Sequence, residues 1–339
     1  MALPSIALRC HGGLPPAVCV EQAVAADRAG FSTLWFAENQ FTRGVWPAMA
    51  ACAVATRRLR IGIGVFNPYN RHPSLMAMEM AAFDELSEGR AVLGIGAGIG
   101  AKVKRMQVAN DRPIAAVRDA MTITRRLLGG EEVSYTGKVF SVDGVRLEFP
   151  LRRTDMPILM AAMGEQALRL CAEVADGLMI SNMCPPAYTR RAVAIMREAA
   201  ARAGRPAPRE VVQYVPCCVR DDGDEARRLA KETVAAMLTA YWSQGTASPA
   251  TRAAIADYNG LAPGAFARVM ERLGRGEPPG RVLDDRLLAE YAIAGTLDEC
   301  RERFGVYANA GVTELGLWFV GDRVVDDVAQ LGEALRRIA

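Results

Sequence analysis

Residues 67–98 read NPYNRHPSLMAMEMAAFDELSEGRAVLGIGAG and decide the fold class of this chain. After a short loop, the pattern predicts a helix over Pro73–Glu88, a tight turn at residues 88–90 and a strand over Ala91–Gly96. The strand is apolar on both faces, which is typical of a parallel strand covered by helices. It leads into Gly96-Ala97-Gly98-Ile99-Gly100, where the lack of side-chain bulk lets a ligand lie against the peptide groups. The segment therefore indicates an α/β scaffold with a cofactor-binding loop.

Length and composition narrow the classes of protein. A chain of 339 residues that is 51% hydrophobic fits two average domains or one large α/β barrel. Its longest apolar runs, such as Ala48–Ala55, are too short to span a bilayer, and MALPSIALRC lacks the pattern of a signal peptide. The net charge of +3 is small and the basic residues are dispersed. We therefore expect a cytoplasmic protein that binds neither membrane nor nucleic acid.

Cysteines and histidines give little sign of a metal site. The eight cysteines form no C-x-x-C pair, and most lie in apolar stretches, so we interpret them as small buried hydrophobic residues in a reducing compartment. Only two histidines occur, His11 and His72. With so few imidazoles and no paired thiols, we expect no zinc or iron site.

Strand-like and helix-like segments alternate along most of the chain. Eight strands are predicted, each followed by a helix, together with an inserted β-hairpin at about 130–150 and an irregular insertion with a few short helices at about 243–290. The predicted strands are Ser5–Arg9, Thr33–Ala37, Leu59–Val65, Ala91–Gly96, Pro157–Ala161, Gly177–Ser181, Val211–Val219 and Thr313–Phe319. The predicted helices are Pro16–Ala29, Trp46–Thr56, Pro73–Glu88, Ile114–Leu128, Glu165–Ala175, Pro185–Ala203, Asp224–Trp242 and Val325–Ile338.

This alternation predicts a single (β/α)8 TIM barrel domain over residues 1–339, with the irregular insertion before the last strand. The alternative, a doubly wound sheet with an appended domain, would leave two strand–helix units over. Active sites of such barrels lie at the carboxyl ends of the strands. The candidate positions are therefore Cys10-His11, Glu38-Asn39-Gln40, Gly64 to Asn67, Ala97 to Ile99, Ala161 to Gly164, Ser181-Asn182 and Trp318-Phe319.

Two of these strand ends favour a phosphorylated cofactor. Gly96-x-Gly98-x-x-Ala101 matches a Rossmann pattern, but it follows the fourth strand and precedes a predicted loop with Lys102, Lys104 and Arg105, so a dinucleotide site is disfavoured. The glycines of this segment would then serve either close packing of the chain or contact with a cofactor. Ala162-Met163-Gly164-Glu165 leads into a helix, whose free N–H groups attract anions, and Ser181 could add a hydroxyl. Ordinary loops between a strand and a helix carry similar residues, so these residues alone do not distinguish a phosphate site from such a loop.

Few side chains suit proton chemistry. His11 follows the first strand and is the better histidine candidate, whereas His72 precedes Pro73 at a helix start and suits a capping role. Glu38 closes the second strand and is the leading candidate for a functional carboxylate, with a structural ion pair as the alternative.

The chain resembles the bacterial luciferase-like superfamily, and within it the branch that contains deazaflavin-dependent methylenetetrahydromethanopterin reductase. The resemblance covers nearly the full length, and its most specific parts are DELSEGRAVLGIGAG at 84–98 and Ala175-Asp-Gly-Leu with Ser181. It implies a barrel that binds coenzyme F420 or FMN, with a non-prolyl cis peptide at Gly64–Val65 beneath the cofactor ring. The cofactor contacts that it implies are Glu38, Asn39, Gly64, Val65, Asn67, Ala97, Gly98, Ile99, Ala162, Met163, Gly164 and Ser181.

The sequence also departs from this branch. Glu38-Asn39 replaces the usual Asp-His after the second strand, Ile99 replaces an acidic residue, and Leu8-Arg9-Cys10 stands where the methanopterin reductase has a glutamate. The resemblance therefore leaves the substrate open.

Three functions remain as hypotheses. The first is hydride transfer between F420 and a small organic substrate, with Glu38 or Asn39 at the ring edge and His11 or Tyr69 as proton donors. The second is an FMN-dependent monooxygenase supplied by a partner flavin reductase. The third is a non-catalytic flavin-binding protein.

Two predicted helices are apolar around most of their circumference, Trp46–Thr56 and Pro73–Glu88. An outer barrel helix needs only one apolar stripe. Their small residues Ala48, Ala51, Ala77 and Ala81 would also let another helix approach. We therefore expect a homodimer packed through these helices, which the resemblance also implies.

Overall fold

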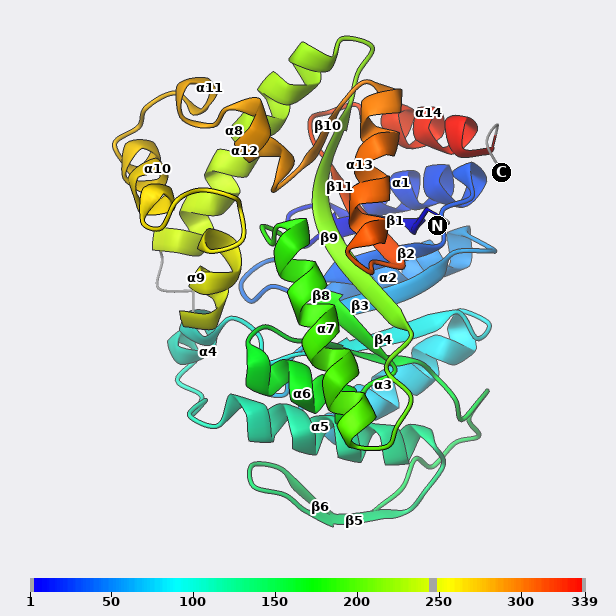
Figure 1. Cartoon of the computed structure of the whole chain (residues 1–339). Coiled ribbons are helices and arrows are strands. Elements are labelled where there is room, and N and C mark those ends of the chain that lie inside the picture. Colours follow the sequence, from blue (N-terminus) through cyan, green and yellow to red (C-terminus); the bar gives the residue numbers. More distant parts are fainter. Residues whose placement is uncertain (1–2, 244–248, 337–339) are drawn as a thin grey trace.

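Eight parallel strands close into a barrel in the computed structural model, which describes residues 3–243 and 249–336 (Figure 1). The closed order is β9-β11-β1-β2-β3-β4-β7-β8, and β8 pairs back with β9. The strands are β1 (Ser5–His11), β2 (Thr33–Ala37), β3 (Arg60–Phe66), β4 (Ala91–Ile95), β7 (Ile158–Ala161), β8 (Gly177–Ile180), β9 (Glu210–Val219) and β11 (Glu314–Phe319). The predicted (β/α)8 barrel is confirmed, and each predicted strand boundary lies close to the observed one.

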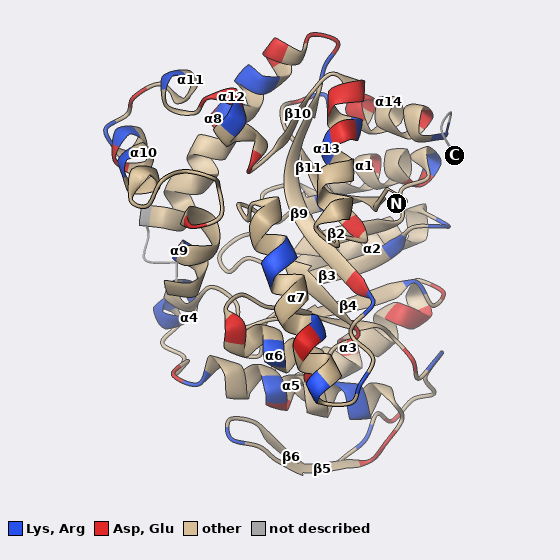
Figure 2. Cartoon of the chain, viewed as in Figure 1, with Lys and Arg blue, Asp and Glu red and all other residues tan. Residues whose placement is uncertain are grey.

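Helices surround the barrel, and the termini lie side by side because α1 packs against α14 (Figure 1). The outer helices are α1 (Pro16–Ala29), α2 (Val45–Ala55), α3 (Pro73–Leu86), α5 (Pro113–Leu128), α6 (Glu165–Val174), α7 (Pro186–Arg202), α8 (Gly223–Ser243), α13 (Leu297–Asn309) and α14 (Val324–Arg336). In Figure 2, Lys and Arg are interspersed with Asp and Glu along these helices, while the strands carry few charges.

Both insertions have the predicted character. Strands β5 (Val133–Thr136) and β6 (Ser141–Val145) form an antiparallel hairpin outside the barrel. The second insertion holds four short helices, and its residues 244–248 lie outside the described part of the chain, as do 337–339 at the end of the last predicted helix. These helices are α9 (Pro249–Ala256), α10 (Ala265–Gly274), α11 (Pro279–Val282) and α12 (Asp285–Ala289).

Three observed elements were not predicted. Residues Gly100–Arg105 form a short helix, α4, where a loop was expected. Strand β10 (Ile293–Gly295) pairs with the end of β9 and is too short to give an alternating pattern. Helix α13 follows it, and its start is readable in the sequence: Thr296 and Glu299 form a capping box, in which each side chain accepts a backbone N–H of the other residue.

The barrel interior is polar at the amino-terminal ends of the strands and apolar above them. At the amino-terminal end of the strands, the buried Glu314 carboxylate accepts hydrogen bonds from Trp35 Nε1 (2.7 Å) and Thr33 Oγ1 (2.8 Å) and pairs with Arg60 (3.3 Å). Above this network the interior is apolar, with Ala7, Trp35 and Tyr214 among its members. Along β1, Ala7 faces this interior while Ile6, Leu8 and Cys10 face the helices, so the alternation also turns Arg9 and His11 inward.

All eight cysteines are free and buried, as predicted for small hydrophobic residues. Within residues 3–243 and 249–336, no helix combines the length and apolar character needed to cross a membrane.

The explanation given for a helix-packing surface on α2 and α3 needs correction. Ala48, Ala77 and Ala81 are buried against the protein's own barrel, so they are not available to a second copy. The exposed apolar side chains of the two helices are instead larger: Val54, Leu75, Met78 and Leu86. The homodimer itself stays a prediction.

Candidate active site

The carboxyl end of β3 carries an irregularity that faces the barrel mouth. The peptide between Gly64 and Val65 is cis, as predicted, and the pairing of β3 with β4 shifts register between Ile63 and Phe66. The Val65 side chain lies over two glycines of the neighbouring segment, because a Cβ at Gly94 or Gly96 would stand only 3.1 or 3.0 Å from its methyl groups. The Val65 side chain therefore covers the glycines at this end of the barrel.

Tyr214 reaches this irregularity from the opposite wall. Its ring lies 6.4 Å from that of Trp35, and its hydroxyl would stand 1.8 Å from a Cβ at Gly64. The hydroxyl is buried without a hydrogen-bond partner among the described residues, and burial raises the pKa of Tyr214 well above its ordinary value. It therefore remains a protonated donor directly below the cis peptide.

Asn67 ties the loops after β3 and β4 together. Its Oδ1 accepts backbone hydrogen bonds from Tyr69 (3.1 Å) and Asn70 (3.0 Å), and only 2% of the residue is exposed. Gly98 has φ +71°, and a Cβ there would meet the Asn67 amide at 2.8 Å. The glycine is thus required by both its conformation and close packing. Ala97 and Ile99 flank it and are half-buried.

The start of α6 forms a second candidate subsite. Gly164, at φ +81°, is its N-cap residue and provides no side-chain cap, so the first N–H groups of the helix remain available. Ala162 is buried and Met163 half-buried. Glu165 is exposed and pairs with Arg169, and its role as a cofactor contact stays a prediction.

Helices α8 and α9 cover the mouth at this point. The Ser181 hydroxyl lies 3.5 Å from the Tyr241 hydroxyl, and Asn182 donates to the same oxygen (3.4 Å). A Cβ at Gly164 would stand 2.9 Å from the Cβ of Ala250 on α9. The insertion therefore covers the loop after β7, and α8 covers the loop after β8; neither contact was predicted from the sequence.

Glu38 takes part in an ion pair. Its carboxylate accepts from Arg71 at 3.0 and 3.1 Å, and Arg71 also pairs with Glu79 at 2.5 Å. The side chains of Glu38 and Arg71 are 12% and 16% exposed, and the guanidinium lies 4.2 Å from the centre of the Phe66 ring. The structure thus gives Glu38 the structural partner that was the alternative to a catalytic role, and its catalytic role stays a prediction. Asn39 beside it is half-buried.

His11 lies at the mouth against an aromatic wall. Its ring is 5.2 Å from that of Trp318, and its Nδ1 accepts the backbone N–H of Gly13 at 3.1 Å. Burial, and next the charge of Arg9, lower the pKa of His11, which favours the neutral ring. Because Nδ1 is an acceptor, the proton of the neutral ring resides on Nε2. The other histidine, His72, caps α3 by accepting the Ser74 N–H, as its position before Pro73 predicted.

Several buried polar atoms at the mouth have no partner among the described residues. They belong to Arg9 (Nε and Nη1), Tyr69, Asn182 (Oδ1) and Tyr214. Buried polar groups are almost always hydrogen-bonded in folded proteins, so such atoms indicate bound water or a ligand. Together with the glycine-lined floor, they fit a planar ring with a phosphorylated side chain. Of these residues, only Tyr69 and Asn182 were singled out from the sequence.

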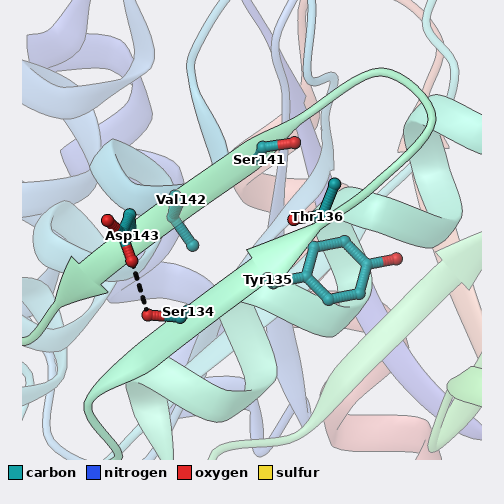
Figure 3. A pocket seen from close by; sticks show the side chains of 6 residues that line it. All are labelled: Ser134, Tyr135, Thr136, Ser141, Val142 and Asp143. Carbon is teal, nitrogen blue, oxygen red and sulfur yellow. Dashed lines mark hydrogen bonds between the residues drawn. The ribbon is translucent and has the colours of Figure 1, made fainter.

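Two surface depressions lie away from the mouth. One, of about 370 Å³, is lined by the β5–β6 hairpin around Tyr135 and Asp143 (Figure 3), and the other, of about 270 Å³, lies between α8, α12 and α13 beside Arg227. Within the described residues, no group of three or more His, Cys, Asp or Glu side chains is placed to hold a metal ion.

The predicted site residues thus form three groups. At the ends of β3 and β4, Val65, which follows Gly64, packs over Gly94 and Gly96, and Asn67 packs against Gly98. Met163, Gly164 and Ser181 lie beneath α8 and α9. His11 lies against β11, and the Glu38–Arg71 pair stands apart from these contacts.

Comparison with known proteins identifies the class. Residues 3–314 match the family described as luciferase-like monooxygenase, and the chain belongs to this family. Within it, the chain lies in the branch of the methylenetetrahydromethanopterin reductases: the reductase of Archaeoglobus fulgidus is 31% identical over 86% of each chain. The chain is also similar to an F420-dependent glucose-6-phosphate dehydrogenase of Microbacterium testaceum, 28% identical over 56% of this chain and 60% of that protein.

A solved structure gives the same picture of the fold. The coenzyme F420-dependent tetrahydromethanopterin reductase of Methanopyrus kandleri superposes with a TM-score of 0.84 and 23% identity over 98% of both chains. The chain is accordingly a luciferase-like oxidoreductase, which confirms the resemblance inferred from its sequence.

Proposed function

We propose that this protein transfers a hydride between coenzyme F420 and a small organic substrate. The observation that carries the proposal is the arrangement at the ends of β3 and β4, where Val65 packs over Gly94 and Gly96, and Gly98 packs against Asn67. Its membership of the reductase branch supports F420 as the cofactor. The substrate of those relatives is not carried over, because Arg9 stands in the region where the resemblance implies a glutamate.

Each group of residues has a proposed task. The deazaflavin ring, when bound, supplies the two-electron chemistry. Gly64, Val65 and Gly98 provide the surface on which it lies, and Asn67 fixes the two loops that form this surface. The start of α6 and Ser181 hold the phosphate, since N–H groups and the helix dipole both favour an anion. His11, neutral with its proton on Nε2, is placed to donate a hydrogen bond at the mouth.

Titration of the purified protein with F420 and with FMN, followed by ring absorbance and by calorimetry, tests this proposal. We expect micromolar or tighter binding of F420 and at least tenfold weaker binding of FMN. Tight FMN binding without F420 binding would contradict it. Binding of F420 without turnover over a broad panel of alcohols, aldehydes and enones would instead support a non-catalytic role.

The second candidate is an FMN-dependent monooxygenase that receives reduced flavin from a partner reductase. The description of the matched family favours it. The two candidates differ in their need for oxygen: the monooxygenase consumes it stoichiometrically with substrate, whereas F420-dependent hydride transfer proceeds under argon. Measuring turnover in both atmospheres separates them.

A further inference from the structure

The inner wall formed by β1, β9 and β11 contains an arginine that has no counterion within residues 3–243 and 249–336. Arg9 projects into the barrel, with its guanidinium carbon 4.8 Å from the centre of the Tyr214 ring and 5.5 Å from that of Trp318. Its Nε and Nη1 are buried and have no hydrogen-bond partner, and no carboxylate among the described residues forms an ion pair with it. The neighbouring acids are already engaged: Glu314 pairs with Arg60, and Glu38 with Arg71.

Such a charge calls for an anion. A guanidinium cannot lose its proton in a protein, and in the half-buried Arg9 two of its three nitrogen atoms are buried without a hydrogen-bond partner among the described residues. The two aromatic rings stabilise the charge through cation–π contacts, but they leave the N–H donors of Nε and Nη1 unsatisfied. These two atoms lie on different edges of the guanidinium, and each edge is completed by Nη2, so a carboxylate can be bound by Nη2 together with either of them.

The position of Arg9 separates it from the proposed cofactor groups. The ring surface and the phosphate subsite come from the ends of β3, β4, β7 and β8, which are consecutive in the barrel. Arg9, Tyr214, Trp318 and His11 come from β1, β9 and β11, which are also consecutive and form the other half. Tyr214 joins the halves, since it lies beneath Gly64. The half of the barrel that holds Arg9 is therefore the half that the proposed cofactor contacts leave open to a substrate.

We propose that the substrate of this enzyme is a small organic acid whose carboxylate is bound by Arg9 between Tyr214 and Trp318. That the bound acid is a substrate rests on the proposed function, but the anion site itself does not depend on the cofactor. His11 lies on the same strand, one step nearer the mouth and against the same Trp318 ring, so it would face the part of the acid beyond its carboxylate.

Binding of neutral and anionic probes tests this site without knowledge of the substrate. We would titrate the protein with acetate and benzoate, and with acetamide and benzamide, by calorimetry and ligand-observed NMR, before and after loading with F420. Loss of one charge-assisted hydrogen bond corresponds to about tenfold in affinity or more, so each acid should bind at least that much tighter than its amide. Equal affinity of acid and amide, or no binding of either acid, would overturn the proposal.

The variant Arg9→Met should abolish this preference, while Arg9→Lys should retain part of it. Arg301→Met, at an exposed arginine on α13, serves as the matched control and should leave acid binding unchanged. The melting temperature of Arg9→Met should equal or exceed that of the wild type, because the variant removes an unpaired charge; a purely structural arginine predicts a decrease. If Arg9→Met fails to fold, the comparison of acid and amide in the wild type still decides whether the protein has an anion site.

Loading with F420 distinguishes the two proposals. Acid binding that persists in the loaded protein supports Arg9 as a substrate anchor. Acid binding that F420 abolishes would assign Arg9 to the cofactor and overturn it. If F420 does not bind but the acids do, the cofactor assignment fails while the anion site stands.

Discussion

The hydroxyl of Tyr214 occupies the space that a side chain at residue 64 would need, 1.8 Å from the position of a Cβ on Gly64. This contact crosses the barrel from β9 to β3, and it makes the glycine a requirement of packing rather than of the strand itself. It also places a protonated hydroxyl beneath the cis peptide at the mouth.

Gly64→Ala should therefore destabilise the barrel through overpacking, by about 1–3 kcal/mol, and weaken cofactor binding further by displacing the surface under the ring. The double variant Gly64→Ala/Tyr214→Phe should recover part of the stability, because it removes the hydroxyl and leaves the ring carbon 3.0 Å away. Chemical denaturation of the wild type, both single variants and the double variant measures this coupling. Strictly additive effects would show that the two residues do not compete for space.

The phosphate subsite can be tested by charge alone. Gly164→Asp should abolish F420 binding, because a carboxylate at the start of α6 repels an anion there. Gly164→Asn is the matched control: it has nearly the same shape, meets the same Ala250 neighbour and takes on the same backbone strain, so it carries the steric cost without the charge. A similar loss in both variants would make the effect steric, and unchanged affinity in both would place the phosphate elsewhere.

Glu38 and Arg71 allow a structural role to be separated from a cofactor contact. Glu38→Gln and Arg71→Met both break the pair, and each should lower the free energy of unfolding by about 1–2 kcal/mol, since these side chains are largely buried. If Glu38 also contacts the ring, Glu38→Gln should reduce F420 affinity clearly more than Arg71→Met. Equal affinities in the two variants would leave Glu38 with its structural role alone.

The two histidines make a pH test simple, because both can be followed by NMR. Burial lowers the pKa of His11 and of His72, and Arg9 lowers that of His11 further. A folded-state pKa below the unfolded value of about 6.5 means that the unfolded chain binds more protons, so stability should rise as pH increases through the interval between the two values. His11→Asn should flatten this dependence, and Arg9→Met should raise the pKa of His11. A His11 resonance titrating above 6.5 would contradict the assignment.

Much of this structure could be predicted because each strand carries its own local pattern. The segment at 91–98, apolar on both faces and followed by glycines, identifies a covered parallel strand wherever it lies in the chain. Contacts across the barrel leave no such pattern. Nothing in the sequence around Tyr214 indicates that it contacts Gly64. The ion-paired Glu38 and Arg71 are likewise 33 residues apart along the chain.

Arg9 was visible in the sequence as a charged residue, but its significance depends on which face of β1 it occupies. SIALRCH places Ala7, Arg9 and His11 on one face, and only closure of the barrel shows that this face is the interior. The cover over Gly164 was equally hidden, because α9 reaches the mouth from an insertion with no regular period. Local sequence thus located the strand ends, while tertiary closure determined which side chains meet there.

The exposed faces of α2 and α3 give a prediction about assembly. Leu75, Met78 and Leu86 lie on one side of α3 at helical spacing, 46%, 43% and 46% exposed, and Val54 on the adjacent α2 is 61% exposed. Apolar side chains grouped in this way mark an interface more often than isolated ones do. We expect a symmetric homodimer in which these helices pack against their copies.

Met78→Glu, or Leu75→Glu with Met78→Glu, should shift this dimer to monomer, because the interface would bury like charges next to their symmetry mates. Sedimentation velocity at micromolar concentration measures the shift. Val139→Glu, which replaces an exposed apolar side chain on the β5–β6 hairpin, is the control and should sediment as the wild type does. A wild-type monomer would refute the prediction, and a dimer that survives the α3 substitutions but not the hairpin substitution would place the interface on the hairpin instead.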